Sequence, residues 1–210
     1  MTRAHAIARH LAHRGVQVVS GGALGIDGAA HRGALAGQGG TTVVLGTGID
    51  VAYPVRHAPL FEQVVASGGA VVSQFPPGTQ PRRFTFVARN KVIAALADVA
   101  IVVEADVRSG SLSTAKAARD LGRLVCAWPG SAGCERLIAS GAATVESLDD
   151  VDAALAGQPV TRALALTGDT KMIADAIASG ARDVDSIISI TGLSVRQVLR
   201  ALQSIPARKS

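Results

Sequence analysis

Residues 16–37 read VQVVSGGALGIDGAAHRGALAG, which is an apolar run, a glycine-rich turn and a helical pattern in succession. The run at 16–20 is rich in β-branched residues and is largely apolar on both faces, as a strand with helices on both sides of its sheet must be. The glycines allow a tight turn into a helix that begins near Ile26. Such a strand–turn–helix unit predicts a parallel sheet where it recurs along the chain.

The unit does recur. Further apolar runs predict strands at 41–45, 70–73, 99–103 and 124–127, with a last short strand around Thr144. Helical patterns lie between and around them, at 3–13, 26–37, 57–67, 86–97, 111–121 and 134–140. The sequence therefore predicts a doubly wound α/β domain with a mostly parallel sheet over residues 1–156.

The pattern changes in the last third of the chain. A short helix at 151–156 ends at Gly157-Gln158-Pro159, and residues 157–168 are expected to form a linker. Residues 169–210 contain no strand-like run, and helices are predicted at about 169–179, 183–190 and 194–204. The turn at 191–194 contains glycine, which is typical of a helix-turn-helix segment, although small three-helix bundles without a DNA role share this pattern.

Composition limits the function classes. Of 210 residues, 48% are hydrophobic and only 18% are charged, which excludes a disordered chain. Lys and Arg number 21 against 16 acids, a net charge of +5 that favours anionic partners but also fits an ordinary surface. No signal peptide or membrane-spanning run is visible, so we expect a cytoplasmic protein without a membrane partner. His10 and His13 share a helix face without a further ligand, so neither a metal nor a cofactor is expected.

Two βα turns could bind an anion. Ser20, Gly21 and Gly22 follow a strand and open a helix, where backbone amides favour phosphate, although a plain tight turn is as consistent with this spacing. The second turn carries Arg108, Ser109, Gly110 and Ser111, also between a strand and a helix. One hydroxyl would suffice to cap that helix, so the additional hydroxyls favour an anion site.

The window from 75 to 91 is the third candidate. It holds three of the chain's four phenylalanines, at positions 75, 84 and 86, and four basic residues, but no acid. Aromatic rings that stack on bases, interleaved with cations that hold phosphates, are typical of single-strand recognition. The alternative is that the rings pack in the core and the cations are solvated. For Phe75, the two interpretations are equally supported.

Two catalytic arrangements are weaker. Ser20, Asp27 and His31 could form a relay, but this serine lacks the strained turn of a nucleophile elbow, and an Asp–His pair on a helix is usually structural. Glu104 lies just after a strand, where ligands bind in open α/β sheets, and is the best single candidate for a catalytic acid.

Taken together, these segments resemble the DprA/Smf family. The resemblance rests on SGGALGID with AAHRGAL (20–35), LGTGIDVAYP (45–54), FPPGT (75–79), FVARNKVIA (86–94), VEADVRSGSLSTA (103–115), and WPG with GCERLIASGA (128–142). This chain departs from the family pattern at several positions. The pattern has arginine at the position of Leu24, proline at that of Val87, often arginine at that of Ala88, and asparagine at that of Glu135. It also has an opening strand, central in the sheet and before the first helix, that we expect to be missing here.

The resemblance implies a Rossmann-like domain that binds single-stranded DNA as a homodimer, loads RecA onto it during natural transformation and recombination, and catalyses no reaction. It implies a pocket built from the two βα turns, Arg83 as phosphate clamp, Phe86 as stacking ring, and a wall of Arg89, Asn90 and Lys91. The C-terminal helices would correspond to a truncated winged helix.

The main alternative is a nucleotide-binding or nucleotide-hydrolysing enzyme of the same Rossmann-like superfamily. Glycosidic cleavage needs a carboxylate to stabilise developing positive charge. Residues 108–118 offer Lys116 and no acid, so Glu104 would have to serve. The sequence therefore favours DNA binding.

Overall fold

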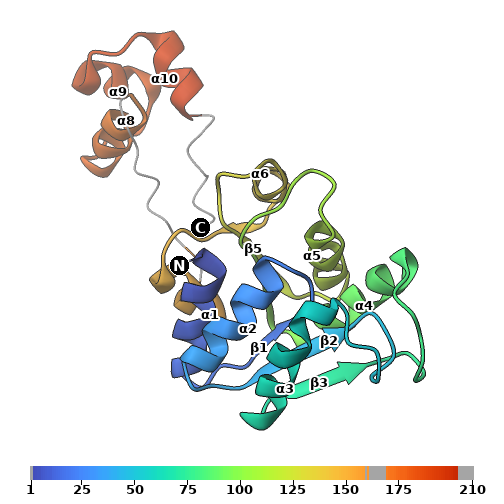
Figure 1. Cartoon of the computed structure of the whole chain (residues 1–210). Helices are drawn as coiled ribbons and strands as arrows, with labels where there is room; N and C mark the ends of the chain where they lie inside the picture. The colour runs from blue at the N-terminus through green and yellow to red at the C-terminus, as the bar shows by residue number, and fades with distance from the viewer. Residues whose placement is uncertain (1, 159, 161–168, 203–210) are drawn as a thin grey trace. The chain divides into compact units, whose positions relative to one another are not determined.

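The computed structural model describes residues 2–158, 160 and 169–202. The chain divides into two compact units, Met1–Val160 and Thr161–Ser210, here called the α/β unit and the helical unit (Figure 1). Among the described residues, no helix has the length and apolar character that a membrane crossing requires.

The six strands of the α/β unit form two parallel sheets. The first has the order β1-β2-β3, with β1 at Val18–Ser20, β2 at Thr41–Leu45 and β3 at Ala70–Ser73. The second has the order β4-β5-β6, with β4 at Val99–Val102, β5 at Leu124–Ala127 and β6 at Ala143–Thr144. The predicted α/β class with parallel strands is confirmed. The strands lie in two sheets rather than one, because in the described residues β1 pairs only with β2 and β4 only with β5.

Helices alternate with the strands along the chain. They are α1 (Arg3–His13), α2 (Ile26–Ala36), the 3-10 turn η1 (Val55–His57), α3 (Ala58–Ala66), α4 (Arg83–Leu96), α5 (Ser111–Asp120), α6 (Ala132–Ala139) and α7 (Leu148–Leu155). Helix α4 begins at Arg83, three residues before the predicted start. The backbone N–H of Arg82 donates to Thr85 Oγ1 (3.2 Å), which closes the first turn there.

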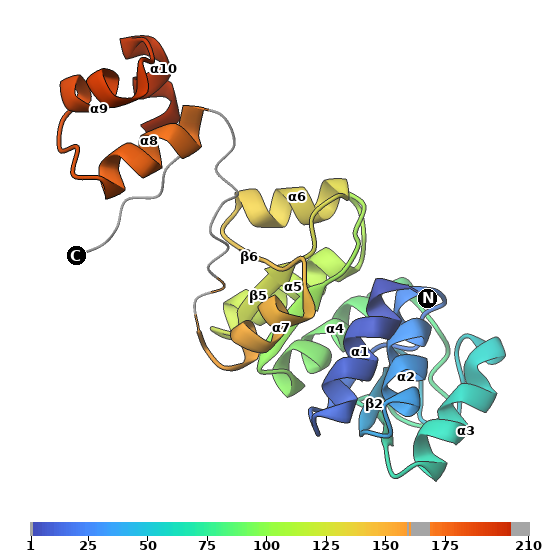
Figure 2. The same cartoon turned by 90° about the vertical axis from the view of Figure 1, so that its left-hand side faces the viewer.

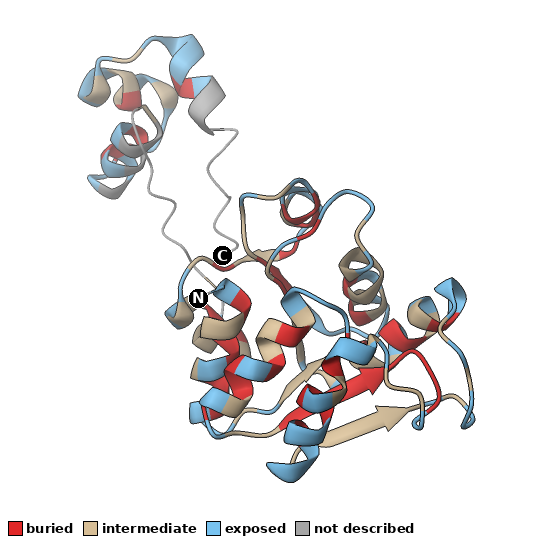
Figure 3. Cartoon of the chain, viewed as in Figure 1, coloured by how far each residue is buried: buried red, intermediate tan, exposed pale blue. Residues whose placement is uncertain are grey.

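The core shows that both sheets are covered on two faces. Ile101 of β4 and Cys126 of β5 pack with α1 and α7, whereas Val102 and Val125 pack with α4, α5 and α6. In the first sheet, Val43 and Leu45 of β2 pack with α2 and α3, while α4 contacts the other face. Strand β2 is buried along its whole length, as Figure 3 shows in red. This two-sided cover is the doubly wound arrangement.

The helical unit contains α8 (Asp169–Ala178), α9 (Val184–Thr191) and α10 (Val195–Leu202), which Figure 2 shows together. Its small core consists of Ile173, Ala176, Ala181, Ile187 and Val198. Asp183 caps α9, and Gly192 ends it with a left-handed φ of 68°. The segment is helical as predicted, and its helix-turn-helix and winged-helix assignments stay predictions. Most of the predicted linker, and residues 203–204 of the last predicted helix, lie outside the described residues.

Candidate functional site

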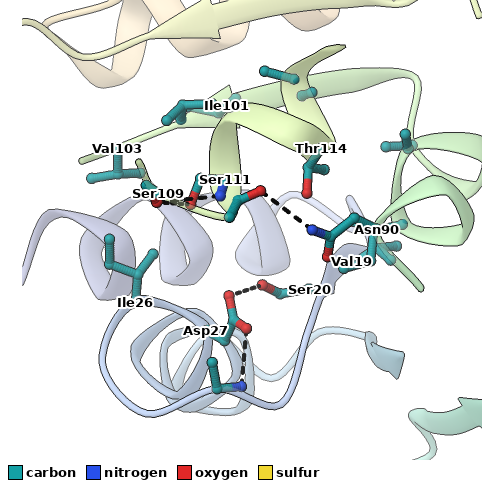
Figure 4. Close-up of a pocket in the computed structure, with 18 of the residues that line it drawn as sticks. Val19, Ser20, Ile26, Asp27, Asn90, Ile101, Val103, Ser109, Ser111 and Thr114 are labelled. Carbon is teal, nitrogen blue, oxygen red and sulfur yellow. Dashed lines mark hydrogen bonds between the residues drawn. The ribbon is translucent and has the colours of Figure 1, made fainter. Parts of the chain in front are cut away.

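A pocket of about 660 Å³ runs along β4 and reaches the carboxyl ends of β1 and β4. Its wall combines the β1–α2 turn, the β4–α5 turn and the inner side of α4 (Figure 4). Of the predicted site residues, it brings together Ser20, Phe86, Arg89, Asn90, Ser109, Gly110 and Ser111. The carboxyl ends of parallel strands are where open α/β sheets bind ligands.

The β1–α2 turn is closed by Asp27. Its carboxylate accepts the Ser20 hydroxyl (2.9 Å) and the backbone N–H of Ala23 (3.0 Å), as drawn in Figure 4. Gly21 must lack a side chain, because a Cβ there would lie 2.5 Å from both the Arg89 guanidinium and the Asp27 carboxylate. Gly22 is likewise buried and does not line the pocket. Gly21 therefore lets α4 approach the turn, and Gly22 makes room for Phe61 of α3 and the Tyr53 carbonyl.

The β4–α5 turn presents hydroxyls at the start of α5. The N–H of Ser111 donates to Ser109 Oγ (3.2 Å), and Asn90 Nδ2 donates to Ser113 Oγ (2.7 Å) and to the Gly110 carbonyl (3.3 Å). Asn90 thus fixes this turn against α4. Because the N–H groups of Ser109 and Ser111 already have acceptors, the turn offers an anion chiefly its hydroxyls and the positive end of the α5 dipole.

Phe86 forms the aromatic part of the wall. Its half-buried ring lies against Gly46, where a Cβ would approach it to 2.5 Å, and 5.5 Å from the ring of Tyr53. The Arg89 guanidinium lies 5.8 Å from the Phe86 ring centre. Tyr53 was not predicted as a site residue. It is exposed, lines the pocket and comes after the carboxyl end of β2, a position that could have drawn attention to it.

Arg89 is held inside the protein. Only 6% of it is exposed; Nη1 donates to the Val44 carbonyl of β2 and Nε donates to Asn90 Oδ1 (3.2 Å). Burial lowers the pKa of Arg89, and the charge of Asp27 opposes that shift. Arg89 therefore joins α4 to the first sheet, whereas the sequence had suggested a free phosphate contact.

The remaining predicted cations are exposed beside the pocket. Arg83, Lys91 and Arg108 are all exposed, and none of them lines it. Phe84, in the first turn of α4, is 65% exposed and next to Arg83. The start of α4 thus carries an accessible ring and an accessible cation, while Phe86 and Arg89 face inward.

Of the two catalytic arrangements considered from the sequence, the structure excludes the Ser20–Asp27–His31 relay and leaves Glu104 as a candidate. His31 is buried, with Nδ1 2.8 Å from Thr41 Oγ1 and Nε2 2.8 Å from the Gly21 carbonyl, so its ring does not contact Ser20 or Asp27. The predicted alternative of a relay is therefore not assembled. Burial lowers the pKa of His31. Glu104 is exposed and does line the pocket.

Two further sequence features have structural explanations. Glu135, which departs from the family pattern, accepts the Gly130 N–H at 2.7 Å and so ties the loop before α6. His10 lies 3.0 Å from Asp152 of α7, and the part of the chain that the structure describes has no cluster of three or more potential metal ligands.

Comparison with known proteins shows the family. The model of DNA recombination-mediator protein A matches residues 1–156. The putative DNA processing protein DprA of Mycobacterium tuberculosis is 48% identical over 151 residues, which are 69% of this chain and 39% of that protein. DprA of Streptococcus pneumoniae is 46% identical over 140 residues, covering 64% and 49%. The chain thus spans less than half the length of these relatives.

Solved structures that resemble this chain belong to the same family. The X-ray structure of DprA from Streptococcus pneumoniae has a TM-score of 0.62 and 42% identity, covering 73% of this chain and 57% of that one. DprA from Helicobacter pylori, described for its single-stranded-DNA binding mode, has a TM-score of 0.67 and 29% identity, covering 73% and 72%. The α/β unit, its motifs and its fold therefore make this chain a member of the DNA recombination-mediator protein A family, also known as DprA or Smf.

Proposed function

We propose that this chain binds single-stranded DNA along the start of α4 and in the pocket at the carboxyl ends of β1 and β4. The observation that carries the proposal is the accessible pair Arg83 and Phe84, next to a pocket walled by Phe86 and Tyr53. The single-stranded-DNA binding described for the Helicobacter pylori relative supports it. Rings that stack on bases beside cations that hold phosphates suit a single strand, because its bases are unpaired.

The roles divide by exposure. Arg83, Lys91 and Arg108 are exposed and can meet phosphates, and Ser109, Gly110 and Ser111 at the start of α5 line the pocket where an anion would lie. Phe84 presents an open ring, while Phe86 and Tyr53 offer ring surface at the pocket wall. Arg89 and Asn90 position these groups rather than binding freely.

We further infer that the chain acts as a homodimer and delivers the bound strand to a RecA-type recombinase during DNA uptake and recombination. The support is membership of a family described as recombination mediators. Co-sedimentation with RecA on a DNA-coated resin, with and without the chain, tests the delivery step. Equal RecA loading in both samples would contradict it.

The DNA proposal is tested by fluorescence anisotropy with a labelled single strand and the matching duplex. Three phosphate contacts, from Arg83, Lys91 and Arg108, give a slope of log affinity against log salt of about −2. Affinity for the single strand should then fall roughly 20-fold between about 50 and 200 mM salt. Arg9→Gln, which removes an exposed cation of α1, is the matched control and should leave the slope unchanged. Equal affinity for duplex and single strand would overturn the proposal.

A nucleotide-hydrolysing enzyme remains a second candidate because Glu104 lines the same pocket. We propose that no such activity is present, since Asp27, one of the two carboxylates that line the pocket, already accepts hydrogen bonds from Ser20 and Ala23, which leaves Glu104 without a second acid. Incubation with a panel of nucleoside monophosphates should release no free base. Base release that is lost in Glu104→Gln would favour the enzyme.

A further inference from the structure

Two buried histidines hold the β1–α2 turn by its backbone. His31 of α2 has its Nε2 2.8 Å from the Gly21 carbonyl oxygen, and His57 of η1 has its Nδ1 2.9 Å from the Gly22 carbonyl oxygen. His31 is 0% exposed and His57 is 5% exposed. A carbonyl oxygen can only accept a hydrogen bond, so each of these ring nitrogens carries a proton and donates it. Two successive carbonyls of the turn are thus bound to side chains inside the protein.

The His31 contact fixes the turn to the first sheet. Its other ring nitrogen, Nδ1, lies 2.8 Å from Thr41 Oγ1, and Thr41 is on β2 beside β1. The contacts of Asp27 with the turn add a second attachment. The Gly22 carbonyl therefore has a fixed position to which another segment can be tied.

The His57 ring lies in a narrow space between two helices. A Cβ at Gly28 of α2 would lie 2.5 Å from His57 Cε1, so the ring lies directly against the α2 backbone. The Phe61 ring of α3 meets the His57 ring at 72°, with the ring centres 6.1 Å apart. These neighbours leave the imidazole little room to rotate away from the Gly22 carbonyl.

His57 also belongs to the short segment that carries Tyr53. The two residues are four positions apart, and the His57 N–H donates to the Pro54 carbonyl (2.9 Å). The Tyr53 carbonyl oxygen lies so near the turn that a Cβ at Gly22 would be 3.0 Å from it. The hydrogen bond from His57 to Gly22 therefore ties segment 53–57 to the β1–α2 turn.

We propose that His57 is a positioning residue for DNA binding: its hydrogen bond to the Gly22 carbonyl holds segment 53–57 against the turn and so keeps the Tyr53 ring beside the Phe86 ring. The two ring centres are 5.5 Å apart, a distance at which aromatic rings are in contact. Because Tyr53 comes from the loop after β2 and Phe86 from α4, a tie is needed to make them one surface on which bases stack. The role of the rings rests on the proposed function, whereas the tie is a property of the chain without DNA.

The first measurement observes Tyr53 directly. It is the only tyrosine of the chain, so the full chain produced with 3-fluorotyrosine reports on this ring alone in fluorine NMR. The folded resonance should differ from its position in concentrated urea, because the Phe86 ring lies beside Tyr53. His57→Leu removes the donor and should move the resonance toward the urea position or split it. His57→Asn places an amide Nδ2–H where the imidazole Nδ1–H was, and should restore the parental resonance.

The control for lost stability is Val64→Ala. Val64 is fully buried in the core between β2 and α3, so its truncation destabilises the same region and leaves the His57 hydrogen bond in place. This variant should keep the parental fluorine resonance. A displacement in Val64→Ala as large as in His57→Leu would assign the effect to stability and overturn the proposal.

The second measurement separates stacking from phosphate contact. Anisotropy titrations compare a single strand with an abasic strand of the same length, which keeps the phosphates but has no bases. His57→Leu should bind the normal strand about tenfold more weakly, because part of the stacking surface is displaced. Its affinity for the abasic strand should stay within about twofold of the parent, because the exposed cations remain. His57→Asn should bind both strands as the parent does.

The outcomes distinguish this inference from the proposed function. A parental fluorine resonance in folded His57→Leu, an equal displacement in His57→Asn, or equal weakening for the two strands would overturn the inference. If His57→Leu does not fold, His57→Gln gives the same comparison, because its amide nitrogen lies one bond further from the backbone and misses the Gly22 carbonyl. Absence of single-strand binding by the parent would contradict the proposed function, whereas the fluorine resonance still decides whether His57 holds Tyr53.

Discussion

Replacing Arg89 with methionine should destabilise the α/β unit and leave the salt dependence of DNA binding nearly unchanged. The reason is that its guanidinium already donates hydrogen bonds to groups inside the protein. It bonds the Val44 carbonyl of β2 and Asn90 Oδ1, and it lies under Gly21, where no side chain could fit. Methionine keeps much of the apolar stem but none of these donors.

The magnitude follows from those contacts. A hydrogen bond from a charged donor contributes about 1.5–3 kcal/mol, and two are lost. Removing a buried charge returns part of its desolvation cost, and half-buried Asp27 loses a compensating charge. The net loss should be about 2–4 kcal/mol. For a chain of this size, that corresponds to a decrease in Tm of roughly 4–16 °C.

The matched variant is Arg83→Met, six residues earlier on the same helix, where the side chain is exposed. Its stability should stay within about 0.5 kcal/mol of the parent. The salt slope should decrease in size by about 0.7, the contribution of one phosphate contact to a single strand. Thermal unfolding by circular dichroism gives the first quantity, and anisotropy titrations at three salt concentrations give the second.

The pair of variants separates positioning from contact. If Arg89→Met unfolds at the parental temperature and lowers the salt slope by the same amount as Arg83→Met, then Arg89 is a free phosphate contact. The interpretation of its burial would be refuted. If Arg83→Met changes neither quantity, Arg83 does not touch the DNA backbone.

Three further outcomes are expected. Phe84→Ala should weaken single-strand binding by about 1–3 kcal/mol, because a base can no longer stack on the ring. The salt slope and the Tm should stay unchanged, since the ring is uncharged and 65% exposed. Parental affinity in the anisotropy assay would show that Phe84 is not part of the site. His31 has a pKa lowered by burial, with His57 and Arg32 adding to the shift while the Gly21 hydrogen bond and Asp27 oppose it. The unfolded chain therefore takes up this proton first, and stability should fall as pH drops from about 6.5 toward the lower folded-state pKa. His31→Gln should flatten that dependence in urea titrations, and an unchanged slope would assign it to other groups. Burial raises the pKa of Cys126 to about 11, so its thiol should resist iodoacetamide at about pH 8 until the protein unfolds, as mass spectrometry would show; labelling at the denatured rate would contradict this.

The strands were largely predictable because each is indicated by a short run of adjacent residues. The strands β2, β3 and β5 have the predicted bounds, since each is a short apolar run between turn residues. The start of α4 was missed because residues 83–85 carry no apolar periodicity. What begins the helix there is a side-chain contact, Thr85 Oγ1 accepting the N–H of Arg82.

That shift of three residues also explains how the site residues divide. Once Phe84 and Phe86 both lie on a helix, they are two positions apart, about 200° around its axis, and cannot face the same way. From the sequence, Phe86 was predicted as the stacking ring and Phe84 was not assigned to the site, although Phe84 has the more exposed ring in the structure. Only the position of α4 against Gly21 and Gly46 decides which ring and which cation turn inward.

The separation into two sheets has a different origin. Val18, Val19, Val99 and Ile101 have the composition of interior strands, apolar and β-branched, which is why one doubly wound sheet was predicted. Yet these residues are half-buried at strand edges, while β2, with a similar sequence, is buried throughout. Natural edge strands are usually short, charged or interrupted by proline to prevent further pairing, and β4 has none of the latter two devices. Composition alone therefore predicted one sheet, because residues of interior character lie at the edges where the structure divides the strands into two sheets.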